Sequence, residues 1–160
     1  MVGRGPMASG ALQQMIESTR WGELDVLFVD MPPGTGDIQL TLSQRTRLAG
    51  AVVVTTPQDI ALIDARRAIE MFQKVSVPII GLVQNMATHL CSNCGQEDPV
   101  FGSDGGQTLA NEYEAPVLAN IPLSRVIRET SDAGAPISAV DNDGSVAAAY
   151  REAAAAVMTT

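Results

Sequence analysis

The chain has 160 residues, of which 46% are hydrophobic and 18% are charged, and its formal net charge is −8. These values fit one globular domain with a sizeable core, and the acidic balance argues against nucleic acid or an anionic membrane as the main partner. Because the sequence has no run of 18 apolar residues and no signal-peptide pattern at its start, we expect no membrane partner. Two cysteines at metal-ligand spacing, without a disulfide framework, suit a reducing cytoplasm.

The hydrophobic pattern predicts helices and strands that alternate along the chain. In order, we expect a helix at 10–20, a strand at 24–30, a helix from Asp37, a strand at 51–55 and a helix at 59–74. We then expect a strand at 78–83, a long loop at 86–104, a helix at 106–114, a strand at 117–121, and helices at 124–133 and 143–158. Such alternation predicts a parallel sheet with helices on both faces.

The residues that follow the predicted strand 24–30 read DMPPGTGD, from Asp30 to Asp37. A carboxylate at the end of a buried parallel strand lies where open α/β sheets bind their ligands. Gly34 and Gly36 would let backbone N–H groups approach phosphate oxygens. An ordinary strand-to-helix turn would explain the glycines and a capping Asp37, but not Asp30 with two prolines behind it. The loop therefore favours a magnesium and nucleotide site.

The only two cysteines, Cys91 and Cys94, form a C-x-x-C pair. This spacing suits half of the ligand set of a zinc ion or an iron–sulfur cluster, and it does not distinguish the two. His89 is a candidate third ligand or a solvated loop residue, and a second copy of the chain could supply the missing thiolates. A redox pair, a strained disulfide and two unrelated free thiols are the alternatives.

Seven short sequence motifs occur along the chain in a distinctive order: RGPM at 4–7, WGELD at 21–25, DMPPGTGD at 30–37, QNM at 84–86, CSNCG at 91–95, FG at 101–102 and IPL at 121–123. Together they resemble the Mrp family of ATP-binding iron–sulfur cluster carriers, which are relatives of the MinD and ParA ATPases. The resemblance implies a P-loop NTPase-like α/β fold and a homodimer that holds a [4Fe–4S] cluster between paired cysteine loops. It also implies slow ATP hydrolysis with Mg²⁺ and delivery of the cluster to apo iron–sulfur proteins.

The resemblance assigns roles to six residues. Asp30 matches the Walker B aspartate, which holds magnesium through water, and Gly34 matches the glycine that senses the γ-phosphate. Asn85 matches a residue that hydrogen-bonds adenine, Pro122 belongs to a turn near the base, and Cys91 and Cys94 match the cluster ligands. Without the resemblance, Asn85 and Pro122 read as a turn residue and a helix entry.

One feature of the family is missing from these 160 residues. No G-x-x-x-x-G-K-[ST] phosphate loop is present, and the only lysine, Lys74, lies in a predicted helix. Residues 1–160 therefore look like a single partial domain, the C-terminal part of a Mrp/MinD-like ATPase domain. By resemblance, the central strand that leads into the phosphate loop is absent, and we expect no ATP hydrolysis by this chain alone. A zinc-binding module without nucleotide and a MinD-like positioning ATPase are the alternative functions, and the cysteine loop disfavours the second.

Overall fold

The computed structural model describes residues 4–32, 36–91, 93–141 and 143–159. Its sheet contains the parallel strands β1 (Ala51–Thr55), β2 (Ile79–Leu90) and β4 (Val117–Leu123), with β2 between the other two. The short strand β3 (Glu97–Asp98) runs antiparallel to the last residues of β2. The helices are α1 (Arg4–Ser18), α2 (Asp37–Arg45), α3 (Asp59–Lys74), α4 (Gly105–Glu112), α5 (Arg125–Asp132), α6 (Ile137–Val140) and α7 (Ser145–Met158). The predicted α/β class with a mostly parallel sheet is confirmed.

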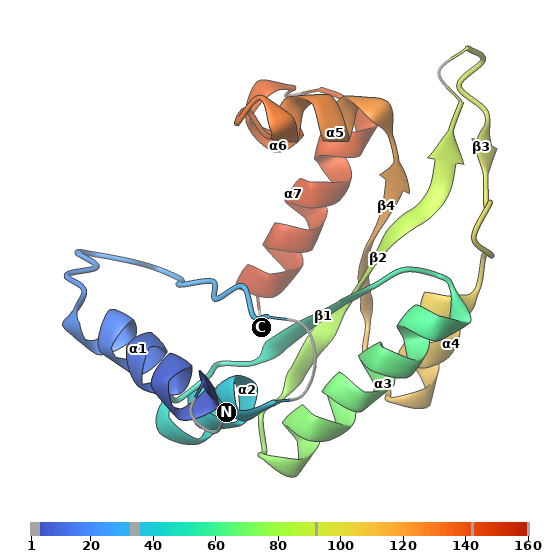
Figure 1. The fold of residues 1–160 in the computed structure, drawn as a ribbon. Coiled ribbons are helices and arrows are strands. Elements are labelled where there is room, and N and C mark those ends of the chain that lie inside the picture. The colour runs from blue at the N-terminus through green and yellow to red at the C-terminus, as the bar shows by residue number, and fades with distance from the viewer. Residues whose placement is uncertain (1–3, 33–35, 92, 142, 160) are drawn as a thin grey trace.

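The helices cover the sheet as the chain order requires. The connections β1–α3–β2 and β2–α4–β4 step in the same direction across the sheet, and right-handed crossovers then place α3 and α4 on one face. Helix α7 packs against β4 from the other side (Figure 1). The core lies between the sheet and the α3–α4 face, where Val53, Ile69, Leu82 and Leu109 are almost completely buried.

Several predicted elements agree with the structure and others differ in their bounds. Strand β1 and helix α3 have the predicted limits. The predicted loop 86–104 is wrong in its first part, because β2 continues to Leu90 through Met86, whose φ of 54° is left-handed. The first helix begins at Arg4 rather than near Gly10. Helix α6 was not predicted, since four residues are too few for a periodic pattern.

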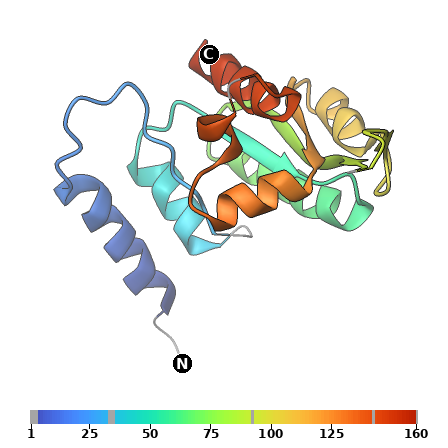
Figure 2. The same cartoon turned by 90° about the horizontal axis from the view of Figure 1, so that it is seen from above.

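The strand predicted at 24–30 is wrong: this segment has no regular secondary structure, bends at Asp25 and belongs to no sheet. Its apolar side chains face solvent, with Leu24 52% and Phe28 66% exposed. Figure 2 shows the segment as part of the loop that connects α1 to α2. A buried parallel strand needs neighbours for its hydrogen bonds and helices to cover it, and the described part of the chain offers this segment neither.

A tight contact between β2 and the start of β4 gives one prediction about stability. A methyl group on Gly81 would lie 2.6 Å from Leu118 Cγ and 2.7 Å from the Pro116 carbonyl oxygen. We therefore expect Gly81→Ala to destabilise the fold by about 1–3 kcal/mol, because the strands must separate to admit it. Urea unfolding followed by circular dichroism measures this change.

Gly10→Ala is the matched control, because Gly10 lies in α1 with open space around it. Alanine is the better helix former, so this variant should be neutral or more stable by about 0.5–1 kcal/mol. Equal stability of the two variants would contradict the close packing of β2 against β4.

Candidate functional site

The two cysteines lie at the tip of the hairpin formed by β2 and β3. The strands pair as His89 with Asp98 and Leu90 with Glu97. At the tip, the Cys91 N–H donates to the Gln96 carbonyl oxygen at 3.0 Å, and the Gly95 N–H donates to the Cys91 carbonyl oxygen at 2.9 Å. The turn also needs Gly95, whose φ is 71°. The hairpin projects from the body of the molecule (Figure 1), so its tip is accessible to another protein.

The local backbone favours a charged sulfur at the tip. The N–H groups of Asn93 and Cys94, together with the Cys94 side chain, lower the pKa of the Cys91 thiol. Cys91 is half-buried and Cys94 is exposed, and both are free. The thiolate is the form that binds iron or zinc, and a lowered pKa favours that form of Cys91.

The ligand set is incomplete within one copy of the chain. Among the described residues, no group of three or more His, Cys, Asp or Glu side chains is placed to hold a metal ion. His89, the candidate third ligand, is exposed on β2 and forms no such group with the cysteines. Two thiolates can occupy only half of a four-coordinate site.

Asn85 and Pro122 lie on the neighbouring strands β2 and β4, Asn85 in the middle of β2 just beyond the point where β1 ends, and Pro122 near the carboxyl end of β4. Asn85 pairs with Ile121, the residue before Pro122, and both Asn85 and Pro122 are half-buried. The Asn85 side-chain oxygen accepts a hydrogen bond of 2.9 Å from the Met86 N–H, which supports the left-handed turn at Met86. The structure thus brings these two predicted residues together at the sheet edge where α/β proteins bind ligands.

Beside them is a cavity of about 310 Å³, lined by residues that include Gln84, Asn120 and Pro122. Gln84 is only 5% exposed, and its side-chain oxygen accepts the Gly106 N–H at 2.7 Å. Its amide nitrogen donates to the Asn120 side-chain oxygen at 3.2 Å. Gln84 and Asn120, which line this cavity, were not among the predicted site residues. The available signal was a polar side chain near the end of each of two neighbouring apolar strands.

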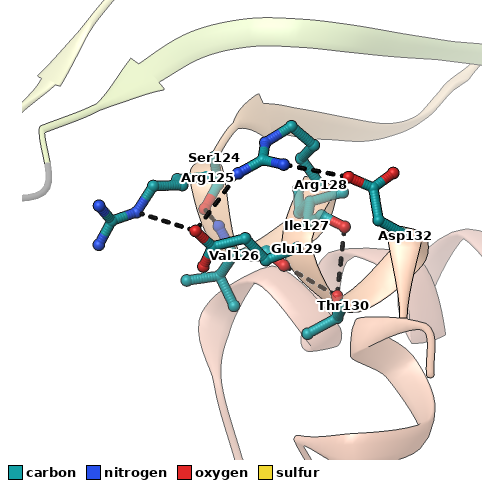
Figure 3. Close-up of polar contacts among 8 residues, drawn as sticks. All are labelled: Ser124, Arg125, Val126, Ile127, Arg128, Glu129, Thr130 and Asp132. Atoms are coloured by element: carbon teal, nitrogen blue, oxygen red, sulfur yellow. Dashed lines mark hydrogen bonds and ion pairs between the residues drawn. The ribbon is translucent and has the colours of Figure 1, made fainter. Parts of the chain in front are cut away.

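Helix α5 follows Pro122 closely and is fixed by its own side chains (Figure 3). The Ser124 hydroxyl oxygen accepts the Val126 N–H at 3.3 Å, which caps the helix. Arg128 lies 3.0 Å from Asp132 and 3.3 Å from Glu129. These exposed ion pairs contribute little free energy, but they neutralise the charges on this helix. The turn predicted at 121–123 is wrong, because β4 continues through Pro122 to Leu123 and the cap of α5 follows directly at Ser124.

Asp30 and Gly34 are the residues predicted for the magnesium and phosphate side of the site. Asp30 is exposed on the unpaired segment. This segment lies at the end of the molecule opposite the cysteine hairpin (Figures 1 and 2). Gly34 lies outside the described residues. The Gln39 side chain donates to the Pro32 carbonyl oxygen at 2.7 Å and holds the end of the segment against α2.

Comparison with known proteins identifies the relatives of this chain. Residues 1–158 match the family described as ParA, the NUBPL iron-transfer P-loop NTPases. An iron–sulfur cluster carrier protein of Pseudomonas fragi is 54% identical over 154 residues, which is 96% of this chain and 54% of that protein. The mouse iron–sulfur cluster transfer protein NUBPL is 46% identical over 99% of this chain and 50% of its own length. The chain therefore spans about half the length of these relatives.

Solved structures agree with this result. A nucleotide-binding protein of Archaeoglobus fulgidus in complex with ADP has a TM-score of 0.72 and 36% identity, covering 80% of this chain and 53% of that one. The cell division ATPase MinD of Pyrococcus furiosus has a TM-score of 0.66 and 20% identity, covering 97% of this chain and 58% of its own, which shows a shared fold. No helix in the described ranges is both long and apolar enough to cross a membrane.

Proposed function

Because the chain belongs to the ParA family of NUBPL-type iron-transfer P-loop NTPases, we propose that it carries an iron–sulfur cluster on Cys91 and Cys94. The observation that supports this most strongly is the projecting hairpin, whose tip holds both thiols and lowers the pKa of one of them. The cluster is the cargo, and its acceptors are apo iron–sulfur proteins. The names of the Pseudomonas fragi and mouse relatives support carriage and transfer of such a cluster.

We propose that the cluster is a [4Fe–4S] cluster held by a homodimer. A four-iron cluster bound through thiolates takes four of them, and each copy offers two. Two hairpins that meet tip to tip across a two-fold axis would supply the four thiolates. Because each hairpin projects from its subunit, the bodies of the two subunits would not clash. Free thiols of this kind suit a reducing compartment, which is why we place the protein in the cytoplasm.

The nucleotide part of the proposal concerns the complete family domain. The ADP complex of the Archaeoglobus relative supports a nucleotide site in this fold. In this chain, Asn85 and Pro122 would contact the base, and Asp30 and Gly34 would lie on the magnesium and phosphate side. These 160 residues contain no lysine-bearing phosphate loop, so they could contact only part of a bound nucleotide. We therefore treat residues 1–160 as one partial domain that does not hydrolyse ATP by itself.

Anaerobic reconstitution with iron and sulfide tests the cluster proposal. We expect about four irons and four sulfides per dimer, and loss of both in Cys91→Ser and in Cys94→Ser, because either change removes two of the four thiolates. His89→Ala is the matched control on the same hairpin and should keep its iron content. Zinc bound in place of iron, without acid-labile sulfide, would support the zinc-binding alternative and overturn the cluster proposal.

A further inference from the structure

The cysteine hairpin belongs to a longer stretch of the chain, residues 87–104, which we call the cysteine arm. The arm leaves the sheet along β2 and returns through β3 to the start of α4 (Figure 1). Its two sides are joined where the Thr88 hydroxyl donates to the Glu97 carboxylate at 3.1 Å. The position of the two thiols at its tip therefore depends on how both ends of the arm are fixed to the body of the molecule.

Gln84 fixes the returning end of the arm. Asp104 precedes α4, but its side chain makes no capping hydrogen bond. The Gln84 side-chain oxygen accepts the Gly106 N–H instead, at 2.7 Å, so β2 supplies the acceptor that the first turn of α4 needs. The approach is close, because a methyl group on Gly106 would collide with that oxygen.

The same side chain also ties this end of the arm to β4. Gln84 is only 5% exposed, and its amide nitrogen donates to the Asn120 side-chain oxygen at 3.2 Å. The cavity of about 310 Å³ beside Gln84 is lined on the arm by Thr88, Glu97, Pro99 and Ser103. Because this cavity leaves the arm without close packing against Gln84, the hydrogen bonds of Gln84 become the contacts that hold α4 and the arm in register with the sheet.

We infer that Gln84 is a positioning residue for the cysteine arm. Its side chain holds the end of the arm at Gly106 against β2 and β4, and it acts on Cys91 and Cys94 only through the arm. The inference rests on the proposed function in one respect, since it takes the two thiols as cluster ligands. A bound cluster needs ligands that are held in place, so a looser arm should release iron more readily.

Distances between spin labels test the position of the arm without iron. In a Cys91→Ser chain, Cys94 is the only thiol, and Glu152→Cys adds a second one at an exposed position of α7. Gln84→Met removes both hydrogen bonds and keeps the length of the side chain. We expect it to broaden the distribution of distances between the two labels by about two-fold or more.

Gln84→Glu is the matched control, because its carboxylate still accepts the Gly106 N–H and the Asn120 amide can rotate to donate to it. Its distance distribution should match that of the parent chain. Slow amide exchange at Leu82, whose N–H donates to the Pro116 carbonyl oxygen at 2.9 Å, shows that a variant keeps its sheet, and Gln84→Leu is the second variant if Gln84→Met does not. An unchanged distribution without the Gln84 amide would overturn the inference, and so would equal broadening in Gln84→Glu.

The second readout uses the chain with both cysteines and a cluster reconstituted anaerobically. We expect a chelator to remove iron from Gln84→Met at least about three-fold faster than from the parent, and from Gln84→Glu at the parental rate. Equal rates for Gln84→Met and the parent would overturn the role of Gln84 in holding the cluster ligands. A parent chain that takes up no cluster would instead contradict the proposed function, and the label distances would still decide whether Gln84 positions the arm.

Discussion

A chain carrying Cys94→Ser is expected to transfer no cluster to an apo iron–sulfur protein. Cys94 is the more exposed thiol of the hairpin, and a dimer of the variant offers two thiolates instead of four. The Cys94 side chain also helps to lower the pKa of the Cys91 thiol, so its loss affects both ligands of the subunit. Recovery of activity by an apo [4Fe–4S] enzyme, followed anaerobically, measures the transfer.

Asn93→Ala is the matched control for this experiment. It keeps the backbone N–H that lowers the pKa of Cys91, and it removes no thiol. Transfer by this variant should therefore remain close to that of the parent chain. Transfer by Cys94→Ser at the parental rate would show that the cluster does not depend on this pair of thiols.

Purified chain, with or without a bound cluster, is expected to hydrolyse no ATP above background. Phosphoryl transfer depends on positioned amides, a lysine and magnesium around the β- and γ-phosphates. Here the lysine-bearing loop is missing, and Asp30 is exposed on a segment outside the sheet. Release of inorganic phosphate under saturating Mg²⁺ and ATP measures this.

The control is Asp30→Ala, which should behave like the parent chain because neither is expected to turn over. A phosphate release that disappears in Asp30→Ala would contradict this prediction. It would also show that the isolated chain assembles the magnesium side of the site in a way that the structure does not indicate.

The elements that were predicted correctly are those whose signal is local. Strand β1 is a short run of apolar residues ended by a proline, and α3 combines an amphipathic pattern with an acidic first turn. The cysteine pair is also a local signal, since two thiols at C-x-x-C spacing are typical of metal ligands. Asn85 and Pro122 were proposed as site residues only by resemblance, and the structure places Asn85 opposite Ile121, the residue before Pro122.

The features that were missed depend mostly on contacts between residues that lie far apart in the sequence. Segment 24–30 has the composition of a buried strand, but a strand forms only where neighbours accept its hydrogen bonds. The extension of β2 to Leu90 depends on the left-handed Met86, a conformation that the residue type does not indicate. The hydrogen bond from Gln84 to Asn120 follows from the register of β2 and β4, which a sequence does not display.

Sedimentation velocity under anaerobic conditions, recorded at the visible absorption of the cluster and in the ultraviolet, tests the shared cluster most directly. Our proposal predicts that the visible absorption sediments only with a dimer that contains about four irons, and that the Cys91→Ser chain shows no such species. Removal of the cluster should remove the coloured species. A fully loaded cluster that sediments with a monomer would contradict the account.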